Sequence, residues 1–227
     1  MTLPSKGEKA TQVREMFDRI APRYDLVNRI MTFGMDSGWR RRAVALLRLE
    51  PGAIVGDVAC GTGDLCREVQ AQGGVAVGFD LSYGMLTSAT TTAPLVQSDG
   101  SKLPLRDGSL YGVTCGFALR NVVDIGELFA EFARVTTPRG RIAIIEVARP
   151  NSKVLQAGHS FYFNKIVPMI GGLLSDKDAY RYLPESVAYL PPTDDLKLML
   201  NKAGFEEVAV RSLGMGAAQL ITATRSN

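Results

Sequence analysis

Apolar residues in the first fifty positions recur at the spacing of amphipathic helices. A first helix is expected before Pro22, because proline disfavours helical geometry in the residue that precedes it. A second helix is expected from about Asp36 to Arg48, ending before Pro51-Gly52. The apolar positions are Val13, Met16, Phe17 and Ile20 in the first helix, and Trp39, Ala43, Val44, Leu46 and Leu47 in the second.

From Ala53 to Pro150 short β-rich runs alternate with helical segments. Helices are expected to begin at Asp64, Ser82 and Asp124. Strands separated by helices at this spacing predict βαβ units and a parallel sheet that is covered on both faces. The expected strands are AIVGDVA (53–59), VAVGF (75–79), LVQ (95–97), LYGVTCGFAL (110–119) and RIAIIEV (141–147).

The alternation stops after Pro150, where about forty residues are rich in tyrosine and phenylalanine. We expect residues 151–192 to form a lid over a hydrophobic cleft. Their apolar run FYFNKIVPMIGGLL contains Pro168 and two glycines, so it is too broken and too short to span a bilayer. The chain closes with an expected helix from Asp194 to Lys202 and two strands, FEEVAVR and AAQLITA, separated by a turn at Gly214.

Size and composition favour one elaborated domain. The chain has 227 residues, of which 46% are apolar and 22% charged, and a domain usually takes about 100 to 200 residues. We expect four parts: an N-terminal helical cap (1–50), a cofactor-binding core (51–150), the lid (151–192), and a C-terminal helix and hairpin (193–227). The excess of 26 Lys and Arg over 23 Asp and Glu leaves a net charge of +3, too small to predict a nucleic-acid partner.

The location expected from the sequence is the cytoplasm. The first residues, MTLPSKGEKATQ, lack the apolar segment of a signal peptide. Cys60, Cys66 and Cys115 form no CxxC pair, so neither a disulfide framework nor a metal site is predicted. The run Arg40-Arg41-Arg42 is interpreted as a solvated helix face, and contact with lipid headgroups or phosphates is the alternative.

The sequence VGDVACGTGD at positions 55–64 carries the most specific chemistry. It is a strand that ends in an acid, followed by a loop with Gly61 and Gly63 and a helix start, where backbone amides can approach a ligand closely. The next strand ends at Asp80, where doubly wound folds place an acid for ribose hydroxyls. Cys66 replaces the third glycine of a dinucleotide site, and Asp57 and Asp64 would repel phosphates. A nucleoside with a cationic group fits better than NAD or FAD.

Four blocks of the chain resemble the ubiquinone/menaquinone biosynthesis C-methyltransferase family, within the class I Rossmann-like methyltransferases. The blocks cover nearly the whole chain in order. They are MFDRIAPRYDLVNRIMTFGMDSGWRR (16–41), DVACGTGD (57–64) with Asp80, FALRNVVD (117–124), and RVTTPRGRIAIIEVARP (134–150) followed by AYRYLPES (179–186).

The resemblance implies a seven-stranded, mostly parallel sheet with a C-terminal antiparallel hairpin, and S-adenosylmethionine as the cofactor. Asp80 would hold the ribose, and Asp99 with Gly100 would lie near the adenine. Asp36 stands where the family usually has histidine, so it is given no catalytic role. The cofactor-binding residues implied are Asp57, Gly61, Thr62, Gly63, Asp80, Leu81, Asp99, Gly100 and Gly116.

Methylation of a quinol ring needs no enzyme nucleophile, because the quinol hydroxyl makes its ortho carbon nucleophilic. The protein must orient the ring and stabilise developing charge on oxygen. Arg120 and Asn121, after the fourth strand, and Tyr24 are expected to do this. The alternatives are an Arg120 ion pair with an acid, Asn121 as the cap of the next helix, and core packing for the tyrosines. Substrate contacts are expected from Asn28, Tyr162, Tyr180 and Tyr182.

The expected reaction is C-methylation of a polyprenyl quinol, with demethylmenaquinol favoured over a benzoquinol by the similarity of stretches such as CGFALRNVVD. One alternative is a methyltransferase for another small aromatic or lipid acceptor, which need not keep Tyr24 and Arg120. The other is a non-catalytic subunit that binds S-adenosylmethionine. Peripheral contact with a membrane and a homodimer are both left open.

Overall fold

The computed structural model describes residues 6–148, 169, 176, 179, 182 and 186–227. Most of the expected lid, including Tyr162 and Tyr180, lies outside the described residues. Tyr182 is a half-buried helical residue. The short helix η4 (Val187–Tyr189) lies near the end of the range 151–192 that was predicted to form the lid. The division of the chain into four parts stays a prediction.

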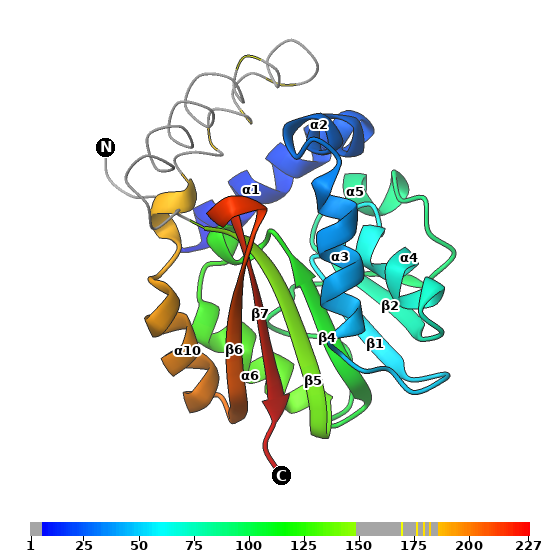
Figure 1. Cartoon of the computed structure of the whole chain (residues 1–227). Coiled ribbons are helices and arrows are strands. Elements are labelled where there is room, and N and C mark those ends of the chain that lie inside the picture. Colours follow the sequence, from blue (N-terminus) through cyan, green and yellow to red (C-terminus); the bar gives the residue numbers. More distant parts are fainter. Residues whose placement is uncertain (1–5, 149–168, 170–175, 177–178, 180–181, 183–185) are drawn as a thin grey trace.

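A seven-stranded sheet forms the centre of the molecule, in the order β3-β2-β1-β4-β5-β7-β6 (Figure 1). The first five strands run parallel, whereas β7 lies between β5 and β6 and is antiparallel to both. The fold predicted from the sequence is therefore confirmed. The strands are β1 (Ile54–Val58), β2 (Val75–Asp80), β3 (Leu95–Gln97), β4 (Leu110–Gly116), β5 (Thr136–Val147), β6 (Phe205–Leu213) and β7 (Ala218–Arg225).

Helices cover both faces of the sheet, which explains why its central strands are nearly continuous apolar runs. Helices α6 (Ile125–Val135) and α10 (Thr193–Lys202) bury Phe129, Phe132 and Leu196 against one face. On the other face lie α3 (Met35–Ala45) and α4 (Asp64–Ala71), and α5 (Tyr83–Thr87) follows β2 (Figure 1).

The N-terminal helices cross the end of the sheet where the parallel strands finish (Figure 1). They are α1 (Lys6–Ile20), the 3-10 turn η1 (Ala21–Arg23) and α2 (Tyr24–Met31). The first helix and its end before Pro22 agree with the pattern of the sequence, but α2 was not predicted. The second predicted helix is shorter than expected, because it ends at Ala45 and Arg48 adopts a φ of 54°.

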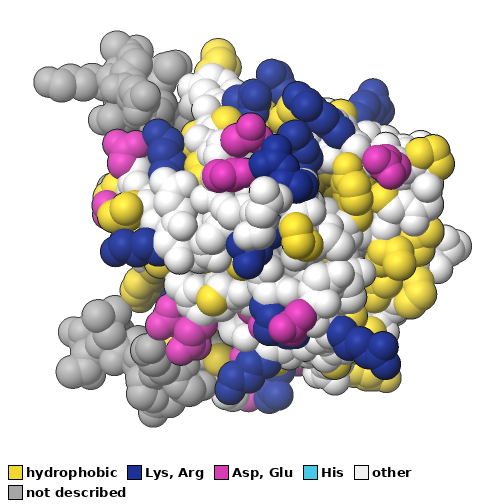
Figure 2. All heavy atoms as spheres, turned by 90° about the horizontal axis from the view of Figure 1, so that it is seen from below, with side chains coloured by type: hydrophobic (Ala, Val, Ile, Leu, Met, Phe, Trp, Pro, Cys, Tyr) yellow, Lys and Arg dark blue, Asp and Glu magenta, His cyan; other side chains and the backbone are white. Residues whose placement is uncertain are grey.

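Within the described residues, no helix combines the length and the apolar character that crossing a bilayer requires. The end of the molecule that faces away from the N-terminal helices carries acidic and basic side chains intermixed over its surface (Figure 2).

Candidate active site at the carboxyl end of the sheet

A cavity of about 420 Å³ lies at the carboxyl ends of the parallel strands, and residues of α1 and α2 complete its wall. Open α/β sheets bind ligands at this edge. The structure brings eight of the predicted site residues together there. Those on the wall are Tyr24, Gly61, Asp80, Leu81, Asp99, Gly100, Gly116 and Asn121.

Other predicted residues lie behind the wall rather than on it. These residues are Asn28, Asp57, Thr62, Gly63 and Arg120.

Gly61 and Gly63 in the loop are each required to be glycine for a different structural reason. Gly61 has a φ of 54°, and a Cβ added there would meet only Tyr24, at 4.0 Å, so a side chain would project beside the cavity wall. Gly63 has a φ of 84° and precedes α4, and a Cβ there would come within 2.6 Å of Thr91. Gly61 therefore leaves room for a ligand, whereas Gly63 permits close packing of the helix start.

Asp80 ties the loop to the end of β2. Its Oδ2 accepts a hydrogen bond from the Gly61 amide and its Oδ1 accepts one from the Ser82 amide, both at 2.8 Å. Burial raises the pKa of Asp80, while these two amides act to lower it. Each carboxylate oxygen still has acceptor capacity for a ligand hydroxyl.

Contrary to expectation, the two acids that flank the loop, Asp57 and Asp64, do not line the cavity. Asp57 is fully buried and accepts hydrogen bonds from Thr114 and Cys66, and burial raises its pKa to about 7. Asp64 pairs with Arg40, at 2.8 Å, and with Arg67. The predicted repulsion of phosphate by Asp64 is therefore wrong, because two guanidinium groups neutralise that carboxylate.

Two strained residues shape the cavity. Ala59 follows β1 with a φ of 54°, and Phe117 follows β4 with a φ of 57°. Both line the cavity. Positive φ is costly for residues other than glycine and tends to occur at functional sites, where surrounding structure holds it in place.

Two aspartates of the N-terminal helices bind segments at the carboxyl edge of the sheet, and neither was predicted from the sequence. The Oδ1 atom of Asp18 accepts hydrogen bonds from the Ser82 hydroxyl, at 2.6 Å, and the Gly84 amide, at 2.8 Å. Asp25 accepts one from the Thr62 hydroxyl at 2.5 Å. A signal existed for Asp25, since it lies in the family-like block of residues 16–41. Its partner is 37 positions away and could not be read from local sequence.

We expect Asp18→Ala to speed amide hydrogen exchange in α1 about tenfold or more, because hydrogen bonds to a charged acceptor contribute about 1.5–3 kcal/mol. Asp18→Asn is the matched control, since its amide oxygen can accept both hydrogen bonds that now go to a single atom. Hydrogen exchange with mass spectrometry measures the effect. Equal exchange in the wild type and Asp18→Ala would show that α1 is held by its apolar contacts alone.

Tyr24 and Arg120 approach the same part of the site from different elements. The Tyr24 side chain is half-buried beside Asn28 on α2, and desolvation raises the pKa of its phenol, so it stays protonated and can donate. Arg120 is buried: its Nη1 donates to Glu146 at 2.5 Å and to the Phe117 carbonyl at 2.7 Å. The ion pair named as the alternative for Arg120 is thus present, yet its charge still acts on the Tyr24 phenol.

Three buried polar atoms near the cavity find no hydrogen-bond partner within the described residues. They are Ser98 Oγ, Asn121 Oδ1 and Arg120 Nε. Ser98 and Asn121 line the cavity. The alternative that Asn121 caps the next helix is wrong, because Asp124 accepts the hydrogen bonds from the first amides of α6. Buried polar groups are normally paired, so these atoms are suited to a polar ligand.

The fold is shared with solved methyltransferase structures at low sequence identity. One is a SAM-dependent methyltransferase from Thermotoga maritima, with a TM-score of 0.66 and 18% identity, covering 94% of this chain and 99% of that one. Another is phosphoethanolamine N-methyltransferase 2 from Haemonchus contortus in complex with S-adenosyl-L-methionine, with a TM-score of 0.62 and 14% identity, covering 94% and 60%. These similarities support the class I methyltransferase fold.

Sequence relatives are much closer. The chain is 41% identical to the demethylmenaquinone methyltransferase of Roseiflexus sp. (strain RS-1), covering 97% of this chain and 96% of that protein. It is 37% identical to the ubiquinone/menaquinone biosynthesis C-methyltransferase UbiE of Geobacter sulfurreducens, covering 98% and 91%. The model of the ubiE/COQ5 methyltransferase family matches residues 5–225. The predicted resemblance is confirmed: the chain belongs to the ubiE/COQ5 methyltransferase family and is an S-adenosylmethionine-dependent methyltransferase.

Proposed function

We propose that the protein methylates a ring carbon of a polyprenyl quinol, most specifically that of demethylmenaquinol. The observation that carries this proposal is a single cavity with two kinds of wall. Asp80, Asp99 and the Gly61 backbone line one part, whereas Val13 and Phe17 of α1 line another. A polar nucleoside and an apolar acceptor can therefore meet in one enclosed space. The names of the relatives from Roseiflexus and Geobacter support the quinone class.

The residues present fit S-adenosylmethionine. Asp80 offers carboxylate acceptors for the ribose, and the buried Ser98 Oγ and Asn121 Oδ1 need polar partners. Gly61 leaves the loop backbone accessible. When bound, the cofactor supplies an electrophilic methyl group on a sulfonium. Asp80, Ser98 and Gly61 would hold the polar groups of the cofactor and fix its position against the acceptor, which Asn121 would contact.

The protein's part in the reaction is positioning and electrostatic stabilisation. With the cofactor bound, the ortho ring carbon would attack the methyl group and displace it from sulfur while the quinol hydroxyl loses its proton to water. The ring proton would then leave to water and the oxygen would be reprotonated. Negative charge therefore develops on the quinol oxygen in the transition state. We propose that the protonated Tyr24 phenol donates to that oxygen, and that the nearby Arg120 charge stabilises it. Asn121 would orient the ring from the cavity wall.

The test is methyl transfer to matched acceptors. We expect demethylmenaquinol to be converted to a product heavier by one methyl group, identified by mass spectrometry, and a demethylated benzoquinol to react more slowly. A prenyl tail buried against the apolar wall contributes about 0.8 kcal/mol per CH₂ group, so removing the tail should lower kcat/KM at least tenfold.

Equal kcat/KM with and without the tail would contradict an apolar tail site. No product with any quinol, together with transfer to another small aromatic acceptor, would favour the alternative acceptor class. Titration with the demethylated cofactor is the control that the protein is folded and able to bind.

A further inference from the structure

We propose that the outer face of α2 docks the protein on a bilayer that contains anionic lipids. This face is formed by Leu26, Arg29 and Ile30. The proposal rests on the proposed function, because a polyprenyl acceptor resides in a membrane, and it adds the surface by which the protein reaches that membrane.

The apolar part of this face is exposed although the rest of α2 is well packed. Val27 is fully buried in a cluster with Ile20 of α1 and Met85 of α5, and Tyr24 lines the cavity. Leu26 and Ile30 lie one helical turn apart on the side turned away from Tyr24 and are 55% and 39% exposed. Large side chains exposed together mark an interaction surface more often than singly scattered ones do.

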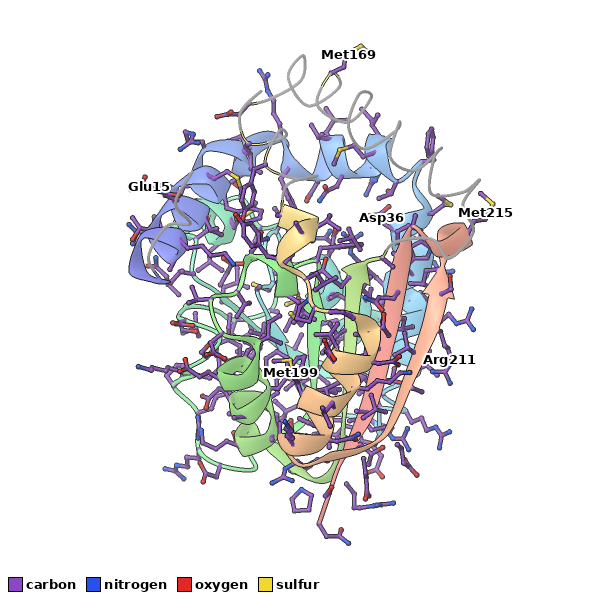
Figure 3. The ribbon with its side chains drawn as sticks, turned by 90° about the vertical axis from the view of Figure 1, so that its left-hand side faces the viewer. Glu15, Asp36, Met169, Met199, Arg211 and Met215 are labelled. Atoms are coloured by element: carbon purple, nitrogen blue, oxygen red, sulfur yellow. The ribbon has the colours of Figure 1, made fainter. Side chains whose placement is uncertain are left out.

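The same end of the molecule carries further exposed apolar side chains. Met35 begins α3 and is exposed, and Met215, 80% exposed, lies in the turn between β6 and β7. That turn packs on α3, since a Cβ added at Gly214 would come within 2.6 Å of Trp39. Figure 3 shows Met215 projecting at the end of the molecule where Asp36 and the start of α3 lie.

The acidic and basic side chains of α2 and the start of α3 face in different directions. The acids turn inward: Asp25 bonds to Thr62, and Asp36 is buried against Thr32 and Arg40. Arg29 is exposed and forms no ion pair with any residue that the structure describes. An apolar face bordered by outward-facing arginine is the pattern of a helix that lies on an anionic membrane surface.

A lipid surface explains the inward-facing acids and the outward-facing Arg29 better than a second copy of the chain does. In a two-fold contact through α2, equivalent arginines approach one another and repel. Anionic headgroups attract the same arginines. Docking through α2 also places the cavity beside the bilayer, because Tyr24 on the inner side of the same helix lines the cavity.

The test is co-sedimentation of the full chain with vesicles. We expect binding to phosphatidylcholine vesicles that include phosphatidylglycerol, much weaker binding to phosphatidylcholine alone, and loss of binding at high salt. Because each leucine-sized side chain that enters the bilayer contributes about tenfold in affinity, the double variant Leu26→Ser/Ile30→Ser should bind at least tenfold more weakly. Arg29→Gln should reduce only the salt-sensitive part.

Leu198→Ser is the matched control, since Leu198 is 52% exposed on α10 and should not affect vesicle binding. Turnover of a tail-free acceptor in solution separates the two proposals. It should be unchanged in the double variant. Absence of methyl transfer to every quinol, with or without a tail, would reject the proposed function but not the docking surface. Wild-type vesicle binding by the double variant would overturn the docking surface. A dimer that the double variant abolishes, without vesicle binding, would assign this face to a second copy.

Discussion

Asp80→Ala is expected to weaken binding of the demethylated cofactor by at least about 1.5 kcal/mol, more than tenfold, because it removes a charged acceptor from two ligand hydroxyls. The structure adds a second cause. The Asp80 carboxylate also accepts hydrogen bonds from the Gly61 and Ser82 amides, so its loss unties the glycine loop from β2. Both effects reduce affinity, and the loss should exceed that from removing a ligand contact alone.

Isothermal titration calorimetry measures this loss directly. Asp80→Asn is the informative intermediate, since its side chain keeps one acceptor oxygen but cannot accept at both positions. Asp107→Ala serves as the control, because Asp107 is an exposed partner of Arg134 and lies in no predicted part of the site. Unchanged affinity in Asp80→Ala would move the ribose site away from β2.

The sheet and the cofactor loop could be predicted because their determinants are local. Short apolar runs, the glycines at 61 and 63, and an acid at the end of β2 are each visible within a few residues. The starts predicted for the strands and helices between Ala53 and Asp124 consequently agree with the structure to within a few residues. The family resemblance then supplied the antiparallel hairpin of the last two strands, whereas the position of β7 between β5 and β6 was not predicted.

The parts that could not be predicted depend on contacts between distant segments. Helix α2 is short, and its inner face is defined by a cluster with residues of α1, η1 and α5 rather than by local sequence. The contacts of Asp18 with Ser82 and Gly84 likewise require α1 to lie across α5. Glu146 did leave a trace in the sequence. It is an acid within the apolar strand RIAIIEV, and a buried acid of this kind needs a partner such as Arg120.

Arg120→Ala is expected to have two separate effects, on stability and on turnover. Removing the guanidinium leaves the fully buried Glu146 carboxylate without its partner, and breaking a buried ion pair in this way costs about 3–5 kcal/mol. If the Arg120 charge also stabilises the quinol oxygen, kcat should fall about 10²- to 10³-fold in protein that is still folded. Arg139→Ala is the control, because its pair with Glu206 is exposed and should contribute less than about 1 kcal/mol.

The double variant Arg120→Ala/Glu146→Gln separates the two effects. Neutralising residue 146 removes the unpaired buried charge, so we expect it to recover much of the free energy of unfolding, measured by urea denaturation. It cannot restore a positive charge near Tyr24, so kcat at saturating acceptor should remain low. Arg120→Lys should recover only part of the turnover, because an ammonium cannot reproduce the planar donors of guanidinium. If the double variant instead regained both stability and kcat, Arg120 would act only by holding Glu146. Stabilisation of the quinol oxygen would then fall to Tyr24 and Asn121, the two predicted catalytic residues that line the cavity.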